Sequence, residues 1–109
     1  MADTIIDPAQ SAPAAATLTT LYTVPASTTT VVSTITICNR SATADTVRVA
    51  IRIGGAAIAN SHYLIFDESI EGNSHRTLTL GIGLAATTII SVLSTNGTST
   101  FHAYLIQRT

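Results

Sequence analysis

The sequence lacks several residue types that small proteins commonly use: it has one cysteine, no tryptophan and no lysine among 109 residues. A single cysteine cannot form a disulfide within the chain. A domain of this length can bury well over half of its extended-chain surface, so it needs neither disulfides nor a structural metal to fold. Cys38 lies in the apolar run VVSTITIC. Since no neighbouring residue can act as an activating base, we expect a small buried side chain rather than a nucleophile.

Charge is scarce as well. Charged residues make up 10% of the chain and the net charge is -1, whereas 46% of the residues are hydrophobic. Soluble domains usually carry about a quarter charged residues. One interpretation is that other protein covers much of the surface in the working state. The other is that abundant threonine and serine keep a weakly charged surface hydrated. Both can hold, and we favour partial coverage, which predicts a homo-oligomer or another protein partner.

The placement of the charges argues against several classes of protein. The arginines are scattered and form no basic run, so the electrostatic pattern of nucleic-acid binding is missing. The N-terminal residues include acidic Asp3 and Asp7 where a signal peptide is basic, and no stretch is long and apolar enough to cross a bilayer. We therefore expect no nucleic-acid or membrane partner. We also expect that the protein is made and used without Sec export, or that it leaves the cell inside a larger particle.

Residues 1–16 combine two prolines with short apolar pairs and small residues, without helical or strand periodicity. They are predicted to form an extended N-terminal arm, followed by one β-sandwich domain in residues 17–109. Ordering such an arm costs conformational entropy that its own few apolar groups hardly offset. A neighbouring subunit that binds Ile5 and Ile6 would offset this cost, so the arm is expected to contribute to assembly and little to the fold.

After this segment, β-rich runs alternate with turn residues, and no run has helical periodicity. The clearest strand is residues 47–53, where valine and isoleucine alternate with Arg48, Ala50 and Arg52. Asn96-Gly97 is a strong hairpin signal, because a type I′ turn needs positive φ at both central positions. Residues 87–94 and 98–107 are therefore predicted to pair as a hairpin.

About seven to eight strands without a crossover helix predict antiparallel pairing in two packed sheets. The predicted fold is all-β: a single antiparallel β-sandwich of jelly-roll or immunoglobulin-like type with an extended N-terminal arm. The predicted core comprises Leu21, Val31 or Val32, Ile35, Ile37, Val47, Val49, Ile51, Ile53, Leu78, Leu80, Ile82, Ile90, Val92, Phe101 and Leu105.

Catalysis or metal binding would have to use the few histidines and carboxylates. The candidates are His62, His75, His102, Asp67, Glu68 and Glu71. Their spacing matches no metal-ligand motif, no G-x-S-x-G occurs, and the G-x-G at Gly81 and Gly83 lacks the third glycine and the following helix of a phosphate-binding loop. We expect no catalytic residue, no metal and no cofactor, and hence a protein that is not an enzyme.

Arginine is favoured at protein interfaces because it makes planar, bidentate contacts with carboxylates. The expected acidic loop after residue 66 would offer a matching surface on an identical neighbour, and pairing within the chain is an equally good interpretation. The candidate partner-binding residues are Ile5, Ile6, Arg48, Arg52, Asp67, Glu68 and Glu71. Tyr63, His62 and the acidic loop are a candidate contact surface for a glycan or receptor, although few aromatic residues are present for stacking on sugars.

The chain resembles a type of short β-sandwich protein encoded among the structural genes of tailed phages. The resemblance covers residues 18–107 and is carried by the segments LYTVPASTTTVVSTITICNRSATADTVRVAIR, GGAAIANSHYLIFD, RTLTLGIGLAATTIISVLST and FHAYLI. The sequence departs from this type in the charged residues 68–75, where a shorter polar turn is expected. None of the segments is a catalytic signature, so the resemblance implies a β-sandwich scaffold and a place among virion proteins, but no functional site.

The resemblance implies a non-enzymatic structural protein of the virion, made in the cytoplasm of the bacterial host. The favoured function is a capsid decoration or cement protein that binds the major capsid protein, copies of itself, or both. The alternatives are a neck, baseplate or tail-fibre component, and a glycan- or receptor-binding module displayed on the virion.

Overall fold

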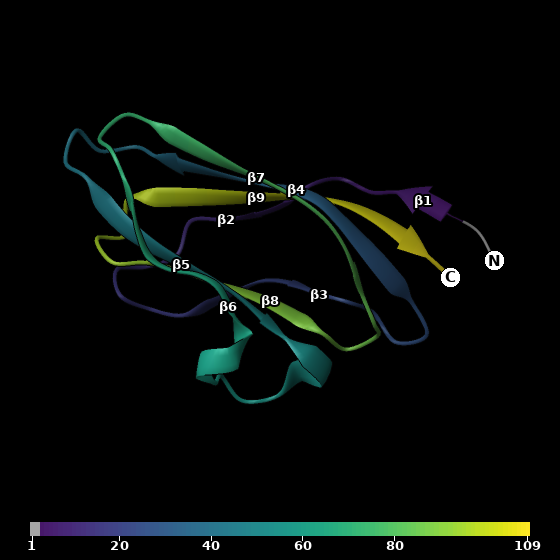
Figure 1. The fold of residues 1–109 in the computed structure, drawn as a ribbon. Helices are drawn as coiled ribbons and strands as arrows, with labels where there is room; N and C mark the ends of the chain where they lie inside the picture. The colour runs from purple at the N-terminus through teal and green to yellow at the C-terminus, as the bar shows by residue number, and fades with distance from the viewer. Residues whose placement is uncertain (1–2) are drawn as a thin grey trace.

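The computed structural model of the chain describes residues 3–109 and forms two β-sheets packed face to face (Figure 1). The first sheet contains β1 (Asp3–Ile5), β2 (Ala9–Ser11), β4 (Thr29–Asn39), β7 (His75–Leu84) and β9 (Ser99–Arg108). The second contains β3 (Thr19–Thr23), β5 (Asp45–Arg52), β6 (Tyr63–Ile70) and β8 (Ile89–Ser94). Two short 3-10 turns, η1 (Ile53–Gly55) and η2 (Asn60–His62), connect β5 to β6. The prediction of an all-β antiparallel sandwich is confirmed.

The order of the strands is that of a jelly roll. In the first sheet β1 and β2 both pair with β9, followed by β4 and β7; in the second sheet the order is β3-β8-β5-β6. All of these pairs are antiparallel. Since β1 and β2 lie end to end along one partner, they act as one interrupted strand. The eight resulting strands follow the two-sheet order of a jelly roll, in which the chain passes repeatedly from one sheet to the other.

The core lies between the two sheets and is filled by the side chains that point inward from each strand. Its largest fully buried side chain is that of Phe101 on β9. Val32 is the buried member of the pair for which the sequence left both alternatives open. The prediction for Ile53 is wrong: it lies in η1, beyond the end of β5, and is 64% exposed. The predicted core residues on β7 are half-buried and pack against the core from its edge: Leu78, Leu80 and Ile82.

Cys38 was expected to be buried and is exposed. It lies near the end of β4, where Ile35 and Ile37 point into the core. Successive side chains of a strand point to opposite faces. Cys38 therefore points away from the core, and the apolar character of the run did not by itself determine its burial.

Residues 1–16 were expected to form an extended arm without strand periodicity; residues 1 and 2 lie outside the described part of the chain, and residues 3–16 contain β1 and β2. β1 and β2 hydrogen-bond to β9 along its outer edge. Ile6 and Ala9 pack against the core, and Pro13 is buried. Strands of three residues are too short to show an alternating pattern, so their pairing comes from the open backbone groups of β9. This segment is part of the sandwich.

The predicted hairpin around Asn96-Gly97 is also wrong. β8 belongs to the second sheet and β9 to the first, so the turn joins strands of different sheets. Gly97 has φ 71°, but Asn96 is not among the residues with positive φ, so the turn is not of type I′. The Gly97 amide donates a hydrogen bond to the carbonyl of Ser94, 3.2 Å away.

A buried carboxylate holds this crossing in place. Asp45, at the start of β5, is 1% exposed. Its Oδ1 accepts hydrogen bonds from the backbone amides of Thr46 and Asn96, each at 2.9 Å. Its Oδ2 accepts the hydroxyls of Ser94 and of Ser99, the latter at 2.6 Å. Asp45 thus ties the end of β8 to the start of β9 and directs the chain into the other sheet.

Candidate functional site

The histidines and carboxylates considered for catalysis form no metal-binding cluster within residues 3–109. In residues 3–109 no three His, Cys, Asp or Glu side chains come close enough together to hold a metal ion. The Nδ1 atom of His62 accepts a hydrogen bond from the backbone amide of Ala59 at 3.1 Å, so this ring closes a turn. The expected absence of an active site stays a prediction. No helix within the described range is long and apolar enough to cross a membrane.

The candidate partner-binding arginines contact groups of their own chain. Arg48 binds Asp67 through two hydrogen bonds of 2.7 and 3.1 Å. Arg52 donates from Nε to the carbonyl of Ala56 at 2.7 Å, which fastens the η1 turn. Both contacts fit the interpretation that arginine pairs within the chain. A role of either residue toward a partner stays a prediction.

The acidic segment is not the loop that was expected. Asp67 and Glu68 lie inside β6, and Glu71 directly follows this strand. Glu68 forms an ion pair with Arg76 of β7, with 3.5 Å between Nη1 and Oε2. In the sequence the segment resembles a loop because its side chains do not alternate. The structure explains this, since β6 is bulged at Asp67, which has φ 56°.

A row of exposed apolar side chains crosses the outer face of the first sheet. Ile5 of β1 lies opposite Ile106 of β9, and Ile106 lies opposite Val31 of β4. All three side chains are exposed, Ile5 to 84%. Tyr104, two residues before Ile106 on β9, is exposed on the same face. We call these four residues, Ile5, Val31, Tyr104 and Ile106, the Ile106 patch.

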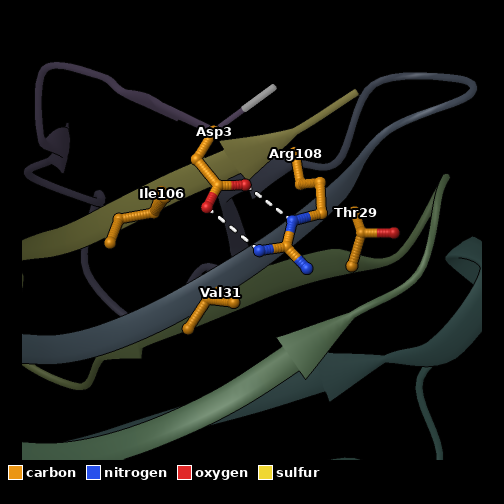
Figure 2. A pocket seen from close by; sticks show the side chains of 5 residues that line it. All are labelled: Asp3, Thr29, Val31, Ile106 and Arg108. Carbon is orange, nitrogen blue, oxygen red and sulfur yellow. Dashed lines mark hydrogen bonds and ion pairs between the residues drawn. The ribbon is translucent and has the colours of Figure 1, made fainter. Parts of the chain in front are cut away.

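An ion pair borders the Ile106 patch at the chain ends (Figure 2). Arg108 donates two hydrogen bonds to the Asp3 carboxylate, of 2.6 and 3.0 Å, and joins β9 to β1. These hydrogen bonds hold the pKa of Asp3 below its usual value. Figure 2 shows this pair beside Ile106 and Val31. Charges of both signs therefore lie beside the apolar row.

The surface around the patch is hollowed on both sides of Ile106. One depression, of about 200 Å³, is lined by Asp3, Thr29, Val31, Ile106 and Arg108. The other, of about 340 Å³, is lined by Ile5, Ile6, Pro8, Ser33, Tyr104, Leu105 and Ile106. Of the sequence-predicted contact residues, Ile5 and Ile6 thus lie at this surface, with Ile6 half-buried against the core. Ile106 and Val31 were missed, because exposed and buried positions of a strand carry the same apolar residue types here.

The outer edges of both sheets are irregular. The first sheet ends on one side in the interrupted pair β1 and β2, and on the other in β7, where Gly81 has φ 68° beside a register shift. The second sheet ends in β3 and β6, and each shows register shifts against its partner. Bulged and short edge strands resist pairing with a strand from another molecule. Association through the sheet faces is therefore favoured over association through the edges.

A second exposed group lies on the outer face of the second sheet. Phe66 of β6 is 56% exposed, and its ring meets that of Tyr63 edge to face, with 4.9 Å between ring centroids. The guanidinium of Arg48 lies 3.9 Å from the centroid of Phe66. A depression of about 440 Å³ is lined by Asn60, Tyr63 and Phe66. The sequence indicated Tyr63 but not Phe66, although Phe66 alternates with Ile65, which packs against the core.

Comparison with known proteins assigns the chain to no family. No family model matches it, and no curated protein matches it. Function is therefore inferred from the two surfaces described above and from the resemblance noted in the sequence.

Proposed function

We propose that the protein is a non-enzymatic structural protein that assembles through the Ile106 patch. The proposed setting is the virion of a tailed phage, where the protein decorates or cements the capsid by binding the major capsid protein, copies of itself, or both. The observation that carries the assembly role is the apolar row Ile5–Ile106–Val31 on an exposed sheet face. The setting rests on the resemblance of residues 18–107 to short sandwich proteins of tailed phages.

The size of the patch suits a protein that binds in many copies. The exposed fractions of Ile5, Ile106 and Val31 are 84%, 37% and 39%, so covering them would stabilise a complex by roughly 2–5 kcal/mol. Association costs an estimated 4–15 kcal/mol of translational and rotational freedom. A single contact of this kind is therefore weak, and its strength grows when several contacts act together on a lattice.

The test is incorporation into particles. Ile106→Asp places a charge in the centre of the patch and is expected to reduce the copy number per particle at least tenfold, while circular dichroism shows an unchanged fold. Ile53→Asp is the matched control, because it makes the same change at an exposed isoleucine outside the patch. Normal incorporation of Ile106→Asp would show that the patch is not the contact surface.

The copy number of the unaltered protein per particle distinguishes a capsid protein from a tail component. A shell protein is expected in hundreds of copies per virion, which quantitative gel densitometry of purified particles can measure. A few dozen copies or fewer would favour the alternative, a neck, baseplate or tail-fibre component. Absence of the protein from purified particles would refute the virion setting itself.

A further inference from the structure

The bulge in β6 places a carboxylate beside an exposed aromatic side chain on the outer face of the second sheet. Between the pairs Val47–Glu68 and Val49–Ile65, two residues of β6, Phe66 and Asp67, oppose one residue of β5. Asp67 adopts φ 56°, a conformation that aspartate tolerates better than most residues. Bulges commonly re-aim side chains next to functional sites. Phe66 follows Ile65, which packs against the core, so it faces outward as in a regular strand. The bulge turns Asp67 to the same face, where it meets Arg48.

The exposed ring is held in a fixed orientation by two neighbours. The Arg48 guanidinium lies over one face of the Phe66 ring, and its own position is set by the two hydrogen bonds to Asp67. Tyr63 packs against Phe66 edge to face. An exposed apolar ring that is fixed by its neighbours loses little conformational entropy when a ligand covers it.

The polar groups around the ring are planar and together carry no net charge. Asn60 lines the depression with the aromatic pair and offers both a donor and an acceptor. The charges of Arg48 and Asp67 cancel in their ion pair. Aromatic faces attract the weakly positive C–H groups on one side of a sugar ring, since the ring quadrupole is negative at its face. Planar amide, carboxylate and guanidinium groups suit the hydroxyls at its rim.

We infer that the depression formed by Asn60, Tyr63 and Phe66 is a binding site for a neutral saccharide. The depression has a volume of about 440 Å³ and is open to solvent. The cancelled charge of Arg48 gives no attraction for a phosphate or another anion. A peptide strand is disfavoured because β6, the edge strand beside the depression, is bulged and cannot pair regularly. The site lies on the second sheet, whereas the Ile106 patch lies on the first.

The experiment uses the full chain on an array of neutral and anionic oligosaccharides, followed by NMR titration with the strongest neutral one. Resonances of the Asn60 side-chain amide and of the Tyr63 and Phe66 rings are expected to shift. Phe66→Ala and Asn60→Ala are each expected to weaken binding about tenfold or more, because stacking and paired hydrogen bonds are lost. Tyr104→Ala, an exposed tyrosine of the first sheet, is the matched control and should bind as the unaltered chain does.

Three results would overturn the inference: no neutral oligosaccharide binds, binding survives Phe66→Ala with the fold intact by circular dichroism, or anionic oligosaccharides bind in preference to neutral ones. Since Phe66→Ala leaves the Ile106 patch unaltered, loss of saccharide binding without loss of particle incorporation separates this site from the proposed assembly function. Loss of both activities in the Phe66→Ala chain, despite a native fold, would also count against a separate saccharide site.

Discussion

Replacing Asp45 should remove a large polar contribution to the stability of this fold. In Asp45→Ala, the hydroxyls of Ser94 and Ser99, both completely buried, lose their acceptor, as do the amides of Thr46 and Asn96. The two backbone amides are partly buried and can be hydrated in part, whereas the hydroxyls cannot. Hydrogen bonds to a charged group contribute about 1.5–3 kcal/mol each and a buried unpaired donor costs about 1–3 kcal/mol. We therefore expect a loss of about 3–5 kcal/mol, which is a large part of the ~5–15 kcal/mol typical of a domain.

The same site predicts a dependence of stability on pH. Burial would raise the pKa of Asp45, but the hydrogen bonds from Ser94, Ser99, Asn96 and Thr46 outweigh it and lower the pKa below its usual value. A carboxyl whose pKa is lowered by folding stabilises the fold above its unfolded pKa of about 3.9. That stabilisation is lost as the pH falls through the lower pKa of the folded state.

The assay is equilibrium unfolding in urea, followed by circular dichroism at pH 7 and at several values below pH 4. Asp45→Asn keeps the shape of the side chain but cannot ionise, and it separates the charge from the packing. The difference in unfolding free energy between the unaltered chain and Asp45→Asn should be largest near pH 7 and shrink as the pH falls below about 4. A loss under about 1 kcal/mol in Asp45→Ala, or a difference between Asp45→Asn and the unaltered chain that does not change with pH, would refute this reasoning.

Other predictions follow from the same structure. A chain that begins at Ala16 lacks β1 and β2 and should lose roughly 2–4 kcal/mol, lowering the melting temperature by about 10–20 °C; an unchanged melting curve would show that these strands are not part of the sandwich. Gly72→Ala places a Cβ against the backbone of Ala42 and should cost about 1–3 kcal/mol in urea unfolding, whereas Gly83→Ala, whose Cβ meets open space, should cost none of this; equal effects would contradict the packing. Cys38 is exposed and should react with one equivalent of Ellman's reagent without denaturant; reaction only after unfolding would place it in the core.

The sequence alone determined the class of fold, because alternation along a strand is a local property. Val47, Val49 and Ile51 alternate with polar or small residues, and the structure buries all three in the core. The absence of helical periodicity was equally local, and the only helical segments in residues 3–109 are two short 3-10 turns. Scarcity of charge indicated a surface that is partly apolar, but not where its apolar residues gather.

The pairing of strands and the placement of sites were decided by the tertiary structure. Alternation tells which side chains share a face, but it does not tell which strand lies alongside. Asn96-Gly97 therefore suggested a hairpin, whereas in the structure this turn crosses between the sheets and is hydrogen-bonded to Asp45, which is distant in the sequence. The N-terminal strands exist because β9 offers them an edge, not because of their own composition. Ile106 became a candidate contact residue because the strand register places it between Ile5 and Val31, and the bulge in β6 brings Asp67 to the face of Phe66. Neither the register nor the bulge is encoded in a short stretch of sequence.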